Sequence, residues 1–224
     1  MVATAMVGKK GDKGIVMEGP LANWYAKNTA NNLSDFHADA GRIANCLTAG
    51  ARVLEVAPGP GYLSIALAQL GPYQVTGLDI SHSFVRIART NATNAGVVVD
   101  FRHGDASDMP FAADTFDLIV CRAAFKNFAD PIGALREMHR VLRAGGEALI
   151  IDMRRDATNA AIDESVTAMK LSRLDSLITS FIFRHTLRPR AYTTADFQRM
   201  AATTPFGGCQ VSEDPLGLEI RLRK

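Results

Sequence analysis

The segment from Arg52 to Leu63 combines a carboxylate and two glycines in a pattern that could hold a nucleotide-like cofactor. An apolar run contains Glu55, the chain then turns at Gly59 and Gly61, and a helical pattern follows. Glycine has no Cβ, so its backbone can bend sharply and approach a ligand closely. The first N–H groups of a helix have no partner inside it and can donate to an anionic group.

A second carboxylate, Asp79, closes the next apolar run, and Ile80 follows it directly. The two oxygens of one carboxylate can accept hydrogen bonds from both hydroxyls of a ribose. Residues 59–64 also match the dinucleotide pattern G-x-G-x-x-G/A except at Ser64, so the turn alone leaves a nicotinamide cofactor open.

Three later segments decide between these cofactors. Gly104-Asp105-Ala106 follows an apolar run, residues 116–121 form another that ends at Cys121, and residues 140–146 end in two glycines. In this order the motifs resemble the class I S-adenosylmethionine-dependent methyltransferases, specifically the small-molecule type 11 (ubiquinone/menaquinone-biosynthesis-like) group. The resemblance covers about residues 53–152.

The resemblance implies S-adenosyl-L-methionine as the cofactor. Glu55 would orient the glycine turn and the amino-acid end of the cofactor, and Asp79 would hold the ribose. Asp105 would accept from the adenine amino group, while the amide of Ala106 would meet the ring. For Cys121 a small buried thiol is the alternative role. The implied cofactor-binding residues are Glu55, Ala57, Gly59, Gly61, Asp79, Ile80, Gly104, Asp105, Ala106 and Cys121.

Ala57 stands where the family has its first glycine. Its methyl group is expected to exclude a left-handed backbone and to press on the methionine end of the cofactor. Pro58 and Pro60 lack N–H donors and are expected to bias Ala57 and Gly59 toward extended geometry. The amides then left for a ligand are those of Gly59, Gly61 and Tyr62.

Alternating strand and helix patterns predict an α/β fold with a Rossmann-like, doubly wound, mostly parallel sheet of seven strands. Its ligand crevice is expected at the carboxyl ends of the strands. The predicted strands are 52–56, 74–79, 97–102, 116–121, 147–152, 209–212 and 218–222. The predicted helices are 23–31, 34–47, 61–70, 82–95, 131–142 and one from 193 or 194, with Gly145 and Gly146 as a helix stop.

The chain divides into an N-terminal helical segment, residues 1–50, and one methyltransferase-like domain, residues 51–224. The first 16 residues are expected to be mobile. Residues 159–183 carry apolar side chains at helical intervals and resemble the family's lid, an insertion at about 156–190. The short connection between the last two strands cannot cross over, so the last strand is predicted to be antiparallel.

The composition limits the kinds of molecule that the protein is expected to bind. With 25 basic and 23 acidic residues among 224, the chain has no global field for nucleic acid or a membrane surface. The apolar N-terminus is short and precedes its lysines, which is typical of neither a signal peptide nor a membrane span. Three cysteines without a C-x-x-C pair suit a reducing cytoplasm, and no metal-ligand spacing is found.

The methyl acceptor is expected to be a small, hydrophobic molecule modified at O or C. Residues 121–128 lack the Asn/Asp-Pro-Pro-aromatic motif of amino-directed nucleic-acid methyltransferases. His185 and Tyr192 are the candidate catalytic bases, with His37 and Asp152 as further possibilities, and a reaction without a base stays open. Two other functions stay open, a cofactor-binding protein without methyl transfer and an NAD(P)-dependent reductase, as does a homodimer.

Overall fold

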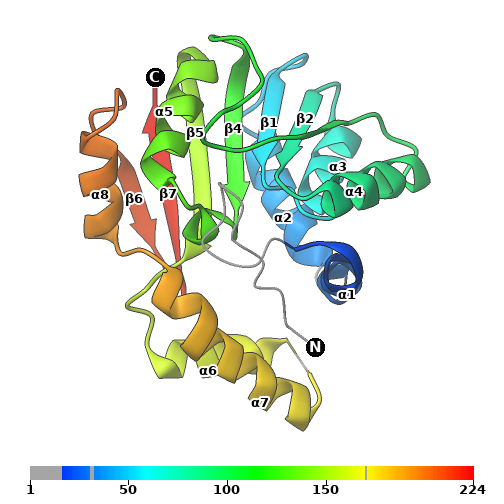
Figure 1. Ribbon diagram of the computed structural model, residues 1–224, viewed down its shortest axis with the longest axis vertical. Helices are drawn as coiled ribbons and strands as arrows, with labels where there is room; N and C mark the ends of the chain where they lie inside the picture. The colour runs from blue at the N-terminus through cyan, green and yellow to red at the C-terminus, as the bar shows by residue number, and fades with distance from the viewer. Residues whose placement is uncertain (1–16, 31–32, 170) are drawn as a thin grey trace, which may run out of the picture.

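Figure 1 shows the computed structural model, which describes residues 17–30, 33–169 and 171–224. The expectation for the first 16 residues lies outside these ranges. Seven strands form one sheet in the order β3-β2-β1-β4-β5-β7-β6. Strands β1 to β5 are parallel, while β7 runs antiparallel to both β5 and β6. The predicted mostly parallel sheet with an antiparallel last strand is therefore confirmed.

The strands are β1 (Arg52–Val56), β2 (Gln74–Asp79), β3 (Asp100–His103), β4 (Phe116–Arg122), β5 (Leu142–Met153), β6 (Gln210–Glu213) and β7 (Gly217–Arg223). The helices are α1 (Gly19–Thr29), α2 (Leu33–Ala44), α3 (Tyr62–Leu70), α4 (His82–Asn94), α5 (Pro131–Val141), α6 (Asn159–Ala168), α7 (Arg173–Ile182) and α8 (Thr194–Ala202).

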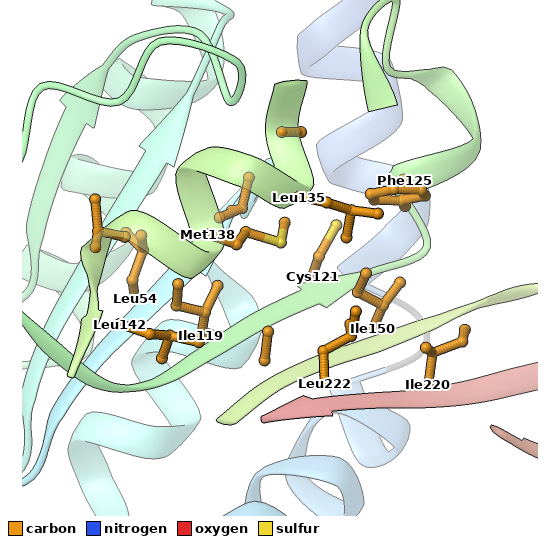
Figure 2. Close-up of a cluster of buried hydrophobic side chains, with 14 of the residues drawn as sticks. Leu54, Ile119, Cys121, Phe125, Leu135, Met138, Leu142, Ile150, Ile220 and Leu222 are labelled. Atoms are coloured by element: carbon orange, nitrogen blue, oxygen red, sulfur yellow. The ribbon is translucent and has the colours of Figure 1, made fainter. Parts of the chain in front are cut away.

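Alternation along the strands separates two apolar layers. Leu54 of β1 points into a cluster with α5 and α8 that contains Leu135 and Phe197. Its neighbour Val53 belongs to the opposite cluster, with α2 and α3. Figure 2 shows part of the first cluster, in which side chains of β1, β4, β5 and β7 pack beneath α5. Helices thus cover both faces of the sheet, so a ligand has access mainly at the ends of the strands.

Polar side chains start the helices where the sequence indicates. Ser81 accepts a hydrogen bond from the Phe84 amide at 3.1 Å, and Asp130 accepts one from the Gly133 amide at 2.8 Å. Thr193 and Asp196 form a reciprocal capping box at α8. These caps satisfy N–H groups that have no partner inside the helix.

Several predicted boundaries are wrong: α1 begins at Gly19 rather than at residue 23, and α2 ends at Ala44 rather than at residue 47. Two further errors have a clear cause. The third strand begins at Asp100 rather than at residue 97, because Gly96, at φ +68°, ends α4 and leaves Val98 92% exposed. Gly145 and Gly146 do not stop a helix: α5 ends at residue 141 and both glycines lie in β5. The Gly145 amide donates to the Lys224 carbonyl, so the glycines serve the pairing of the chain end.

The helical periodicity over residues 159–183 corresponds to two helices, α6 and α7. Ser172 starts the second one by accepting from the Asp175 amide at 3.2 Å. In Figure 1 both helices lie beyond the carboxyl ends of the parallel strands, and α1 lies at the same end of the sheet.

Candidate cofactor and acceptor site

The loops after β1 and β4 carry the strongest backbone signal of a site. The strand order reverses between these two strands, which is where doubly wound sheets bind ligands. Ala57, after β1, has φ +57°, and Ala123, after β4, has φ +58°. Left-handed conformations are costly for residues with a Cβ and gather at functional sites. Both loops at this point of the sheet therefore contain a strained backbone residue.

The glycine turn differs from its predicted conformation. Ala57 adopts the left-handed conformation that its methyl group was expected to exclude, and Gly59, at φ +55°, is not extended. The Ala57 amide donates to the Leu78 carbonyl at 2.8 Å, so pairing with the end of β2 holds the strained residue. Tertiary contacts thus override the local preference.

Gly61 has two reasons to be glycine. Its φ is +84°, and a Cβ there would lie 2.7 Å from the Phe101 ring and 2.9 Å from Ala88. At Gly59, in contrast, a built Cβ meets no atom within 4 Å. The turn therefore packs tightly on its α4 side and faces open space at Gly59, as a ligand cradle requires.

Asp79 joins the loops at the carboxyl ends of β1 and β2. It is only 5% exposed. One carboxylate oxygen accepts from the Gly59 amide at 2.9 Å and the other from the Ser81 amide at 2.8 Å. The Gly61 amide donates to the Pro58 carbonyl at 3.0 Å. Two of the three amides expected to serve a ligand therefore already bond within the protein.

The predicted adenine side is built around Asp105. One oxygen of its half-buried carboxylate accepts from the amide and hydroxyl of Ser107, at 2.8 and 2.9 Å. The Gly104 amide donates to the Asp79 carbonyl at 3.0 Å, which ties the loop after β3 to the end of β2. A Cβ at Gly104 would lie 2.7 Å from Leu78, so packing explains this glycine. Ala106 packs against the main core, and the Ile80 carbonyl contacts His103.

Glu55 is a buried carboxyl group inside the sheet, 3% exposed. The Ser64 hydroxyl of α3 donates to it at 2.5 Å. Burial raises the pKa of Glu55 to about 7, although hydrogen bonds from Ser64 and the charge of Arg122 oppose the shift. The side chain therefore changes charge near neutral pH.

Cys121 does not offer its side chain to a cofactor. It is fully buried among Leu54, Ile119 and Ile150 in the cluster of Figure 2. Burial, with the Asp152 carboxylate nearby, raises the pKa of the thiol well above its ordinary value. The structure thus gives Cys121 the alternative role, a small buried thiol.

The candidate bases lie in different places. His185 is exposed on the π-helical turn that follows α7, with its ring 4.6 Å from that of Phe181. His37 is also exposed and bonds to the Leu33 carbonyl. Tyr192 is half-buried and packs its ring against Phe125, beside the loop after β4. Of the three, only Tyr192 is placed next to an end of a central strand.

Sequence reasoning missed Glu18. Its carboxylate accepts from the amides of His82 and Ser83 at 2.9 and 3.1 Å, which fastens the start of α1 onto the N-terminus of α4. Tyr25, also on α1, packs edge-on against Phe84, while Trp24 is 58% exposed. An acid directly before the Gly19-Pro20 helix start was the available signal.

The Lys126–Asp152 ion pair was also missed as a pair. The sequence suggests Asp152, near the end of β5, only as a base, but its carboxylate binds the Lys126 ammonium at 2.7 Å. Both side chains are buried at the carboxyl ends of β4 and β5.

A surface groove of about 600 Å³ lies elsewhere. Residues that begin strands line it, among them Arg52, Gln74, Asp100 and Phe116. It therefore opens at the amino edge of the sheet, opposite the loops described above. No group of three or more His, Cys, Asp or Glu suited to a metal occurs in the described ranges. No helix within those ranges is long and apolar enough to cross a membrane.

Comparison with known families matches residues 54–150 to a family described as a methyltransferase domain. The match covers 97 of the 224 residues, so this part of the chain is similar to a methyltransferase domain. The matched span runs from β1 through β5 and includes Glu55, Asp79 and Asp105.

Curated relatives agree with this family. A demethylmenaquinone methyltransferase of Listeria monocytogenes is 38% identical over 106 residues, 46% of this chain and 45% of that protein. One of Deinococcus radiodurans is 29% identical over 83% of this chain and 80% of its own length. A ubiquinone biosynthesis O-methyltransferase of Xanthomonas axonopodis is 35% identical over 48% of this chain and 45% of its own. The chain spans about half the length of most of these relatives.

Solved structures share the fold. A Methanococcus maripaludis protein, named as an inferred S-adenosyl-L-methionine-dependent methyltransferase, superposes with a TM-score of 0.76 and 22% identity over 97% of each chain. The [4+2]-cyclase SpnF superposes with a TM-score of 0.59 and 18% identity, over 96% of this chain and 99% of its own. The second similarity shows that one fold hosts different reactions.

Replacing Ala57 by glycine tests the strain in the turn. Relief of the left-handed conformation, about 1 to 2 kcal/mol, should offset the extra chain entropy of glycine, about 0.5 to 1 kcal/mol. The free energy of unfolding in urea should therefore stay level or rise by up to about 1 kcal/mol. The matched control is Ala38→Gly at an exposed interior position of α2, which should lose about 1 kcal/mol. An equal loss in both variants would contradict the strain.

Glu55→Gln tests the buried carboxyl group through pH. Because the folded pKa of about 7 lies above the ordinary 4.5, the protonated form stabilises the fold fully below pH 4.5, and this contribution is lost as pH rises through 7. At about 1.4 kcal/mol per pH unit between the two values, the stability of Glu55→Gln relative to wild type should rise by roughly 3 kcal/mol from pH 4.5 to pH 8. Urea unfolding of both ligand-free proteins measures this difference, and a pH-independent difference would refute the raised pKa.

Proposed function

We propose that the protein is an S-adenosyl-L-methionine-dependent methyltransferase that modifies O or C of a small hydrophobic molecule. The observation that carries the proposal is the buried Asp79 carboxylate, which ties together the loops after β1 and β2 inside the matched methyltransferase domain. The open space over Gly59 and the carboxylates of Asp79 and Asp105 suit an adenosine bound across the ends of β1 to β3.

Each residue near this crevice has a distinct task. Asp79 and Asp105 would accept hydrogen bonds from the ribose and the adenine, and Glu55 would orient the turn. When bound, the sulfonium supplies an activated methyl group with its own leaving group. The protein then has to align the acceptor, exclude water and accept a proton only if the acceptor must lose one. Tyr192 is the better placed of the two predicted bases for that last task.

Apolar side chains near the ends of β4 and β5 support a hydrophobic acceptor. Phe125 packs with Phe128 and Tyr192 beside the loop after β4. Helix α7 of the lid has no buried residue and exposes Leu177 and Phe181 by 70% and 62%. Exposed apolar surface of this kind marks a binding or docking face. The quinone-pathway names of the relatives fit such an acceptor.

A second candidate function is that of a catalyst that shares the fold and binds the cofactor but transfers no methyl group. The similarity to a [4+2]-cyclase favours it, as does the exposed position of His185 on the lid. The family match weighs against a nicotinamide-dependent reductase. The thiols of Cys46, Cys121 and Cys209 form no disulfide, which supports a reducing location such as the cytoplasm.

Methyl-labelled S-adenosylmethionine tests the proposed reaction. The protein should form S-adenosylhomocysteine and a labelled product with 1,4-dihydroxynaphthalene as a C-acceptor probe or 3,4-dihydroxybenzoate as an O-acceptor probe. Mass spectrometry detects both products, and a metabolite extract extends the acceptors. S-adenosylhomocysteine binding without any turnover would favour the second function, and absence of binding would reject both.

Asp79→Asn tests the ribose contact. The amide presents an N–H group where the carboxylate accepts hydrogen bonds, so S-adenosylhomocysteine should bind more weakly by about 1 to 3 kcal/mol in calorimetric titration. The control is Asp100→Asn, an exposed change on the neighbouring strand β3, which should leave the affinity unaltered. If Asp79→Asn binds as tightly as wild type while folded by circular dichroism, the ribose lies elsewhere.

A further inference from the structure

Lys126 and Asp152 form an ion pair that is unusual for its burial. The two residues are 4% and 6% exposed, and the ammonium lies 2.7 Å from the carboxylate. In the other ion pairs of the described residues, both partners keep more than a tenth of their side chain exposed. The pair lies at the carboxyl ends of β4 and β5, one strand away from the turn at Gly59.

The pair holds the loop after β4 through several bonds. The Lys126 ammonium also donates to the Ala123 carbonyl at 2.5 Å, and the second Asp152 oxygen accepts from the Lys126 amide at 2.9 Å. The Ala123 amide donates to the Ile151 carbonyl of β5 at 2.7 Å. Ala123, the residue with φ +58°, is therefore fixed at both its amide and its carbonyl.

Stability alone does not explain this arrangement. Removing two charges from water costs several kcal/mol per ion, and buried pairs can often be replaced by apolar side chains at no loss. The left-handed conformation of Ala123 adds a further cost. An ion pair whose desolvation is costly, and which holds a strained residue after β4, is expected where the loop needs a fixed backbone geometry more than added stability.

We propose that the Lys126–Asp152 pair positions the Ala123–Ala124 backbone so that the methyl acceptor is aligned for transfer. This inference rests on the proposed function. The predicted cofactor contacts, Asp79 and Asp105, follow β2 and β3 on the other side of β1. The pair lies instead beside Phe125, which packs on Tyr192. Its loss therefore affects the acceptor and the transfer step, and leaves cofactor affinity in place.

The double variant Lys126→Met/Asp152→Leu tests the pair without stranding a charge. Since both ions are removed together, no charge is stranded, and the urea midpoint should fall less than in Lys126→Met alone, although the Lys126 and Met153 amides lose their acceptor. S-adenosylhomocysteine affinity by calorimetry should change less than about 3-fold, whereas kcat/KM with the acceptor probe turned over by wild type should fall about 100-fold, the effect of a 1 Å misplacement. Hydrogen exchange of residues 123–128 should speed up. Lys126→Met alone should be less stable, because Asp152 is left buried and unpaired.

Arg143→Met provides the control. It removes the cation of the Arg143–Asp117 pair, which is 2.6 Å long and half-exposed, at the amino edge of the sheet. In this variant the urea midpoint, the S-adenosylhomocysteine affinity, kcat/KM and the hydrogen exchange of residues 123–128 should all match wild type.

Two results would overturn the inference. One is a double variant with wild-type kcat/KM and unchanged exchange at residues 123–128. The other is a double variant that loses stability, cofactor affinity and rate together, which would make the pair a purely structural element. Wild-type protein that binds S-adenosylhomocysteine but transfers no methyl contradicts the proposed function instead, and hydrogen exchange alone then decides whether the pair holds the loop.

Discussion

The Asp79 carboxylate is the constraint on which the cofactor side of this protein depends. Its two oxygens bind the amides of Gly59 and Ser81, and its carbonyl binds the amide of Gly104. One residue thus fixes the loops that follow β1, β2 and β3. A carboxylate that bonds to backbone amides keeps its orientation, so the ribose of the proposed cofactor would meet a preorganised acceptor rather than a mobile side chain. The strained turn at Ala57 persists because this framework surrounds it.

Buried charge is handled differently on the two sides of the crevice. Glu55 lies on β1 and accepts hydrogen bonds from Ser64. Burial raises its pKa toward neutrality, so protonation can remove the free-energy cost of burying its charge. Asp152 has an ammonium partner in Lys126 and is held as an ion pair. The first arrangement leaves a group whose charge responds to a bound cation, such as an ammonium group. The second gives a fixed geometry, which suits alignment of an acceptor.

Much of the fold followed from the sequence because its strands are short apolar runs with clear ends. The bounds of β1 and β2 are as predicted, and the hairpin length required an antiparallel β7. The errors share a cause in tertiary contact. Ala57 is left-handed because Leu78 accepts from its amide, and Gly145 lies in a strand because the Lys224 carbonyl pairs with it. The residues next to Ala57 and Gly145 in the sequence do not indicate either of these hydrogen-bond partners.

The same reasoning explains which site residues could be found. Asp79 ends an apolar run, so its place at the carboxyl end of a strand follows from the strand pattern. The assignment of Asp105 rests instead on the resemblance of Gly104-Asp105-Ala106 to the family motif. Lys126 lies in a short turn, and its partner Asp152 is 26 residues away. Only the neighbouring positions of β4 and β5 bring the two charges together, and a sequence of one chain does not show that adjacency. The Lys126–Asp152 pair is therefore a feature that the three-dimensional structure adds, because it is formed by contacts between strands rather than by a continuous motif.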